Sequence, residues 1–220
     1  FYEILGAAYD ENKEYSKAFE TFTKGFEEFP TYTRFWYHLG ANCLSAKKYE
    51  EAEMYLRKAI QTNPFYASAH LKLGLLMSNS NRMIPAMLSY QLFLMLDNAS
   101  SSSVSVLREY ERMGNGEYKS NPDSIWLKMP DNKDNFQELE AIVKSKFALN
   151  EKYKTNVKLK YTTVVKTMQI VNERLEYNKA DTGFYMQFYV PFYMEMKQAG
   201  ESETAIYYCL RSLDDEAVAK

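Results

Sequence analysis

A strict internal repeat constrains the fold of this sequence more than any other feature. Gly6, Gly40 and Gly74 lie 34 residues apart, and a leucine precedes each of them. At matching distances after each glycine come an alanine and a large apolar residue, giving the pairs Ala18 and Phe22, Ala52 and Leu56, and Ala86 and Tyr90. Pro30 and Pro64 recur at the same interval. A fixed period of this length is typical of a chain built from stacked copies of one supersecondary unit.

The spacing of apolar residues predicts that each unit is a pair of helices. In the first unit, apolar residues recur with helical spacing over residues 1–12 and 15–28, which indicates two amphipathic helices. Glycine and alanine at the repeated positions are small enough to let these helices cross closely. Pro30 and Pro64 cannot continue the helix before them, so each fixes a turn into the next unit. The sequence therefore predicts helical hairpins stacked in order along the chain.

The second unit resembles the tetratricopeptide repeat (TPR), a family of helical hairpins with this period. The matching positions are Trp36, Leu39, Gly40, Ala52, Leu56, Ala59 and Pro64. The family's tyrosine in the middle of the first helix is Tyr9 in unit one, but Cys43 and Met77 take its place in the other units. The resemblance covers residues 1–98. It implies an all-α fold in which three repeats form a right-handed α-solenoid. Helical spacing in the rest of the chain predicts that a C-terminal helical domain follows.

The resemblance also implies a binding site, because the first helices of such an array line a concave groove that takes a peptide or a partner helix. The groove positions are Glu3, Ala7, Asp10, Arg34, Tyr37, Ala41, Leu44, Ser68, Leu71, Lys72 and Leu75. The predicted partner-binding residues among them are Arg34, Tyr37, Ala41, Leu44, Leu71, Lys72 and Leu75. Alternatively, some of these residues only pack against the next unit.

The chemistry of the groove positions favours an apolar or helical segment over a C-terminal carboxylate. The co-chaperone branch of the family holds a carboxylate with lysine and asparagine at fixed groove positions, of which only Lys72 conforms here. We also expect Glu3 to repel a carboxylate. The positions that suit an apolar segment are Tyr37, Leu44, Leu71 and Leu75. We therefore expect a protein-interaction scaffold or adaptor that binds a protein or peptide partner.

The second half of the chain shows helical spacing without a repeat. The polar stretch "NASSSSVS" breaks the period, and we predict an irregular linker containing a helix over residues 99–133. Residues 134–220 form the predicted C-terminal helical domain, whose apolar faces contain Phe136, Leu139, Ile142, Val143, Phe147, Val164, Val165, Met168, Val171 and Leu175. Trp126 should anchor the linker on the body, or else form a partner-binding tip. Ser202 is expected to cap the last helix.

The stretch "GFYMQFYVPFYMEM" repeats the pair Phe-Tyr every four residues, and Pro191 should kink the helix that carries it. We expect the phenylalanines to be core residues and the tyrosines to lie at the margin, with hydroxyls in water or bonded to backbone. The phenylalanines are Phe184, Phe188 and Phe192, and the tyrosines are Tyr185, Tyr189 and Tyr193. Alternatively, the tyrosine row is an exposed patch for a protein partner or for self-association.

The charge and composition argue against several partner classes. The chain has 27 basic and 29 acidic residues and a net charge of −2, too small to attract nucleic acid or an anionic membrane. Its apolar runs are too short for membrane insertion, so we expect a soluble chain, either cytoplasmic or exported. The chain opens at Phe1 inside a predicted helix, so we expect that preceding residues are missing. Its Lys-, Asn-, Tyr- and Met-rich composition is compatible with a bacterial origin.

The sequence offers no recognisable catalytic, metal or cofactor site, so we predict no enzyme and no cofactor. The two histidines, His38 and His70, are interpreted as structural residues, because no carboxylate or cysteine pattern completes a metal or nucleophilic site. Cys43 and Cys209 have no metal-binding spacing. Two alternatives to a scaffold stay open: an enzyme or sensor with its site in residues 99–220, and a structural protein that self-associates.

Overall fold

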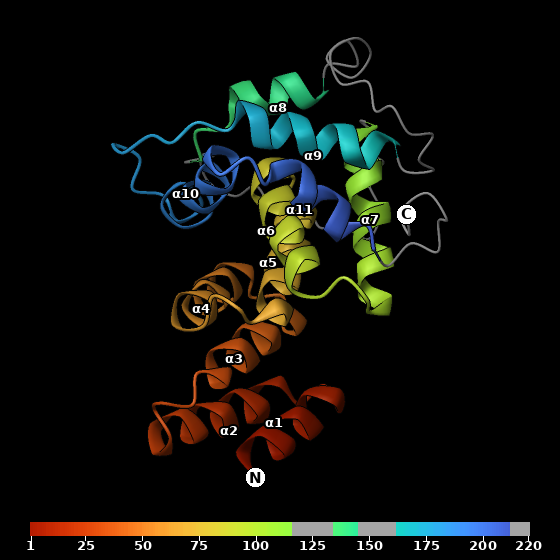
Figure 1. The fold of residues 1–220 in the computed structure, drawn as a ribbon. Helices are drawn as coiled ribbons and strands as arrows, with labels where there is room; N and C mark the ends of the chain where they lie inside the picture. Colours follow the sequence, from red (N-terminus) through yellow and green to blue (C-terminus); the bar gives the residue numbers. More distant parts are fainter. Residues whose placement is uncertain (116–133, 145–161, 212–220) are drawn as a thin grey trace. The chain divides into compact units, whose positions relative to one another are not determined.

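The computed structural model describes residues 1–115, 134–144 and 162–211, and all the secondary structure in these residues is helical (Figure 1). The helices are α1 (Tyr2–Glu11), α2 (Tyr15–Glu28), α3 (Arg34–Ser45), α4 (Tyr49–Thr62), α5 (Ala67–Asn79), α6 (Met83–Leu96), α7 (Ser101–Gly114), α8 (Gln137–Lys144), α9 (Thr162–Arg174), α10 (Phe184–Gln198) and α11 (Ser202–Cys209). The predicted all-α fold is confirmed. The chain divides into two compact units, which we call unit 1 (Phe1–Leu76) and unit 2 (Met77–Lys220). The repeat and domain boundaries predicted from the sequence stay a prediction.

Unit 1 contains the first two of the three predicted hairpins. Helix α1 pairs with α2, α3 pairs with α4, and both α1 and α2 pack against α3 (Figure 1). The turns within the hairpins repeat as well, because Lys13 and Lys47 both adopt a left-handed backbone, with φ of 63° and 61°. In the first turn, the Glu14 N–H donates to the Tyr9 carbonyl at 2.9 Å, which closes the end of α1 as a Schellman-type cap. The same left-handed turn follows α5, at Asn81.

Small residues set how closely the helices cross. A Cβ atom added to Gly6 would lie 2.4 Å from Cε1 of Phe22, and one added to Gly40 would lie 2.8 Å from Cγ of Leu56. These distances are far shorter than a van der Waals contact, so a larger residue at either glycine would displace the facing side chain. The buried core that results contains Ala18, Phe22, Phe35 and Leu39, with Tyr2, Tyr9, Phe19, Phe26, Trp36 and Tyr55 packed around it.

Unit 2 is organised around α6 and α9. Helix α6 is apolar on all sides and almost wholly buried, as expected for a helix surrounded by others; it contacts α7, α8, α10 and α11. Helix α9 packs against α7, α8, α10 and α11 (Figure 1). Polar contacts join these layers. Nε of Arg82, just before α6, donates to Oδ2 of Asp134 at 2.7 Å, and Gln91 donates to Asn172 of α9 at 3.2 Å.

The orientation of α10 differs from the sequence prediction. Tyr185, Tyr189 and Tyr193 are at most 1% exposed, whereas Phe192 is 38% exposed; only Phe184 of the phenylalanines is buried. The reason is that buried hydroxyls find partners inside unit 2: the Tyr193 hydroxyl donates to a backbone carbonyl of α6 at 2.7 Å. Burial also raises the pKa of the Tyr193 phenol. The expectation that the tyrosines lie at the margin was wrong, and so was the exposed tyrosine row proposed for self-association.

Other sequence predictions for the second half have mixed outcomes. Phe136, Leu139 and Val143 are buried as predicted, and α7 is a helix within the predicted linker. Ser202 is the first residue of α11 and does not cap it, because Glu201 occupies the N-cap position. The predictions for Trp126 and Phe147 lie outside the described residues. Among the described helices, none combines the length and apolar character that crossing a membrane requires.

Candidate partner-binding surface

The predicted groove residues lie on α1, α3 and α5, in the part of the chain that belongs to unit 1. We call the following residues the first-helix surface: Glu3, Ala7 and Asp10 of α1, Arg34, Tyr37, Ala41 and Leu44 of α3, and Ser68, Leu71, Lys72 and Leu75 of α5. Arg34 and Leu75 are exposed, and the other nine residues are partly buried. The surface therefore offers side chains to solvent along all three helices.

A charged cluster centred on Glu3 lies at the α1 end of this surface. Oε2 of Glu3 accepts a hydrogen bond of 2.8 Å from the Tyr32 hydroxyl, and Oε1 lies 2.6 Å from Nε2 of His38. Arg34 completes the cluster with an ion pair of 2.8 Å to Oε1. Partial burial disfavours the charged carboxylate, but the hydrogen bonds from His38 and Tyr32 and the Arg34 charge outweigh it and hold the pKa of Glu3 below its usual value.

Two tyrosines extend the cluster toward the start of α5. The rings of Tyr37 and Tyr66 are 5.0 Å apart, and Tyr66 directly precedes α5. A hydrogen bond with Tyr66 is the main cause that raises the pKa of the Arg34 guanidinium. Burial raises the pKa of Tyr37, so both rings present neutral, largely apolar faces. The ring of His38 also stacks on the ring of Phe22, with the two centroids 5.0 Å apart.

The other acidic residue of α1 is also held by neighbouring groups. Nδ2 of Asn42, a buried residue of α3, donates to Oδ1 of Asp10 at 2.6 Å and to the Tyr15 carbonyl at 3.1 Å. Oγ of Ser45 donates weakly to the second carboxylate oxygen of Asp10 at 3.4 Å. These contacts tie α3 to the first hairpin and fix the position of the Asp10 charge.

Along the repeat, the surface becomes more apolar. The residues that correspond by the 34-residue period are Glu3, Tyr37 and Leu71 in one row, and Ala7, Ala41 and Leu75 in the next. Leu71 and Leu75 are one turn apart on α5 and share a face. Leu75 is 41% exposed, so the most exposed apolar side chain of the surface lies at its α5 end, which also carries Ser68 and Lys72.

The structure corrects the prediction for Glu3 and adds residues that the sequence reading missed. Glu3 was expected to repel a carboxylate, but its charge is paired with Arg34 and bonded to two further groups. Tyr32 and Tyr66 were not predicted to belong to the surface. A signal for them existed, because both follow the repeated prolines by two residues and are themselves 34 residues apart.

Comparison with known families agrees with this architecture. Residues 33–66 match the family model described as Tetratricopeptide repeat. The chain contains a TPR. The matched TPR comprises α3 and α4, and its Trp36 packs against both hairpins, with ring centroids 4.3 Å from Phe26 and 5.9 Å from Tyr55. TPR segments generally serve in protein–protein interaction. No curated protein matches the sequence of the chain.

His70, on the first helix after the matched TPR, has a structural role, as predicted. His70 is fully buried, and its Nε2 lies 2.8 Å from the Pro64 carbonyl oxygen, so it joins α5 to the end of that TPR. Burial lowers the pKa of His70 to about 4, although the bond to Pro64 opposes this shift. His70 is therefore neutral near pH 7. Within the described residues, no cluster of histidine, cysteine or carboxylate side chains could hold a metal ion.

Proposed function

We propose that the chain is a protein-interaction scaffold whose first-helix surface binds a helical or extended segment of a partner protein through apolar side chains. The observation that carries the proposal is the α5 end of this surface, where Leu75 is 41% exposed and lies one turn from Leu71. Burying such leucines against a partner stabilises a complex by about 25 cal/mol for each Å² removed from water.

The polar end of the surface suggests how the partner segment is oriented. The carboxylates of Glu3 and Asp10 are already bonded within unit 1, so they need no cation from the partner. The Arg34 side chain is 52% exposed, and it can take an acidic group in addition to Glu3. We therefore propose an amphipathic segment, with apolar side chains over Leu71, Leu75 and Tyr37 and an acidic or polar side chain toward Arg34.

Two features of the described part of unit 2 favour a scaffold over an enzyme or sensor with its site in residues 99–220. The described pocket of this unit is lined by apolar side chains, two carboxylates, a threonine and a tyrosine. The buried Cys209 is held as a thiol, because desolvation raises its pKa to about 12, whereas a nucleophilic cysteine needs a lowered pKa. TPR segments are generally non-enzymatic, in agreement with the scaffold proposal.

A displayed library of random amphipathic peptides, selected on the full chain, tests the proposal. The best peptide is synthesised, and its affinity is measured by fluorescence anisotropy against the wild type and single variants. We expect Leu75→Ser and Tyr37→Ala each to weaken binding by roughly tenfold, which corresponds to about 1.4 kcal/mol. Leu75→Ser is the sharper variant, because this side chain is exposed and its loss leaves the fold intact.

The matched control is Met54→Ser. Met54 is similarly exposed, at 49%, but it lies on α4, a second helix. The control variant should bind the peptide as tightly as the wild type. Equal affinity for wild type, Leu75→Ser and Tyr37→Ala, or an equal loss with Met54→Ser, would overturn the proposed site.

A further inference from the structure

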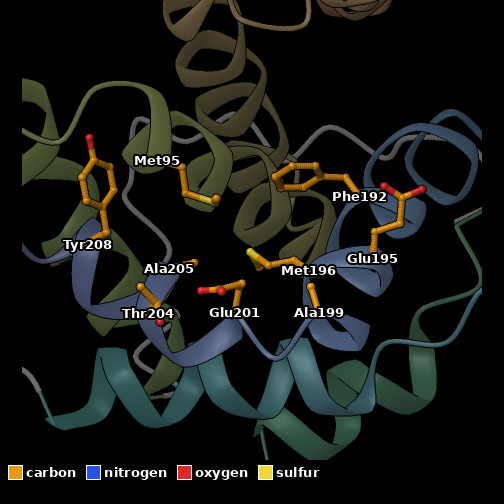
Figure 2. Close-up of a pocket in the computed structure, with 9 residues that line it drawn as sticks. All are labelled: Met95, Phe192, Glu195, Met196, Ala199, Glu201, Thr204, Ala205 and Tyr208. Carbon is orange, nitrogen blue, oxygen red and sulfur yellow. The ribbon is translucent and has the colours of Figure 1, made fainter.

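A second candidate surface lies in unit 2, where α10 turns into α11. An open pocket of about 520 Å³ lies at this place. Figure 2 shows the residues that line it. Its lining residues are Met95 near the end of α6, Phe192, Glu195 and Met196 from the second half of α10, Ala199 and Glu201 from the turn between the helices, and Thr204, Ala205 and Tyr208 from α11. We call it the α10–α11 pocket.

Local backbone chemistry forms this pocket. Gly200 has a φ of +76°, a left-handed value that reverses the chain after α10. The Glu201 N–H donates to the Met196 carbonyl at 3.0 Å and the Gly200 N–H donates to the Lys197 carbonyl at 3.1 Å, which is the hydrogen-bond pattern of a Schellman cap. This cap usually places an apolar residue where Glu201 stands. The cap therefore holds a carboxylate beside Met196 at the edge of the pocket.

The interior of the pocket is apolar and adaptable. In Figure 2 the thioethers of Met95 and Met196 lie near its centre, with the ring of Phe192 toward one end and that of Tyr208 at the other. Phe192 is 38% exposed and Tyr208 is 48% exposed, so both rings are open to a ligand. Methionine side chains adjust to different shapes, and the pocket can therefore accept more than one kind of large apolar side chain.

The charge at the pocket is acidic. Glu195 and Glu201 line it from two sides, and no lysine, arginine or histidine is among the described lining residues. An acidic ligand, such as a fatty acid or an anionic lipid, would meet two like charges. A second copy of the chain, docked face to face, would place the same two carboxylates opposite each other. A ligand that carries positive charge beside apolar groups complements the pocket in both respects.

We propose that the α10–α11 pocket binds a basic amphipathic peptide segment of a partner protein, with leucine-like side chains between Met95 and Met196 and lysine or arginine beside Glu195 and Glu201. This site is separate from the first-helix surface, and its ligand has the opposite charge preference. A scaffold with two such surfaces holds two different partner segments on one chain.

Fluorescence anisotropy with designed peptides tests the proposal on the full chain. The probe is a labelled amphipathic helix of leucine and lysine, and the matched probe has glutamate in place of every lysine. We expect the Leu/Lys peptide to bind and the Leu/Glu peptide to bind at least tenfold more weakly. Ala199→Trp, at an exposed lining position, should fill the pocket and abolish the binding of the Leu/Lys peptide.

Charge variants distinguish binding of the peptide at the pocket from nonspecific attraction between a basic peptide and acidic residues elsewhere on the chain. Glu195→Gln with Glu201→Gln should weaken binding about three- to tenfold, the loss expected for two exposed ion pairs. The control, Glu27→Gln with Glu50→Gln, removes the same charge from exposed positions of unit 1 and should leave the affinity unchanged. Leu75→Ser should also leave it unchanged. Equal binding of the two peptides, or an equal effect of the two double variants, would overturn the proposal.

Discussion

Replacing Gly40 with alanine measures how closely α3 and α4 pack. An added Cβ would lie 2.8 Å from Cγ, 3.0 Å from Cδ2 and 3.1 Å from the backbone nitrogen of Leu56. Overpacking of this kind costs about 1–3 kcal/mol, while alanine in place of a helical glycine gains about 1 kcal/mol. We therefore expect Gly40→Ala to destabilise unit 1 by about 1 kcal/mol, the difference between these two effects.

The same substitution should change sign when Leu56 is shortened. Leu56→Ala alone costs about 2–5 kcal/mol, because its side chain is fully buried. In this background the two side-chain clashes are gone, and Gly40→Ala should become neutral or stabilising through helix propensity. Hydrogen exchange of the α3 and α4 amides, read by mass spectrometry, reports the stability of unit 1 separately from unit 2.

A control variant measures how much helix propensity alone contributes to the stability of unit 1. Ala8→Gly, at an exposed position of α1, should lose about 1 kcal/mol. The reasoning is refuted if Gly40→Ala destabilises unit 1 equally with leucine and with alanine at position 56, because the cost would then not come from this contact.

Three further predictions concern buried groups. Tyr193→Ala should cost about 3–5 kcal/mol and Phe192→Ala about 1 kcal/mol or less in urea unfolding; similar costs would contradict the orientation of α10. Folding lowers the pKa of His70 from 6.5 to about 4. Below pH 6.5 the unfolded chain therefore binds a proton that the folded chain does not, and the free energy of unfolding is about 2 kcal/mol lower at pH 5 than at neutral pH. His70→Gln should flatten the pH dependence of the urea midpoint, and an unchanged slope would contradict this. Arg82→Ala should cost about 3–5 kcal/mol by isolating the buried Asp134 carboxylate from this cation, and adding Asp134→Ala should recover part of the loss.

The repeat explains why unit 1 could be predicted well. A period fixes the register of every helix at once, and the predicted helix over residues 15–28 coincides with α2. The residues of the first-helix surface follow from the same register. Their partners do not, because the period places α1 beside α3 but does not decide that Glu3 bonds to His38 and Tyr32.

Beyond residue 98, unit 2 has no repeat, so the predictions for this part depend on local patterns alone. In α10 the Phe-Tyr pairs produce two adjacent apolar stripes, and local spacing cannot decide which stripe faces α6. The tyrosine stripe faces α6 because the Tyr193 hydroxyl donates a hydrogen bond to the Leu88 carbonyl, and these two residues are far apart in the sequence. The α10–α11 pocket could not be predicted for a similar reason, because Met95 and Met196 are far apart in the sequence and line the same pocket only in the folded chain.

Site-specific photocrosslinking from Leu75 is the most direct test of the scaffold function. A photoreactive amino acid at position 75, and at position 54 as the control, is activated in native cells that express the full chain, and mass spectrometry identifies the crosslinked proteins. The scaffold account predicts a partner crosslinked from position 75, absent from position 54 and lost with Tyr37→Ala. Crosslinking that is equal from both positions, or unaffected by Tyr37→Ala, would contradict binding at the first-helix surface.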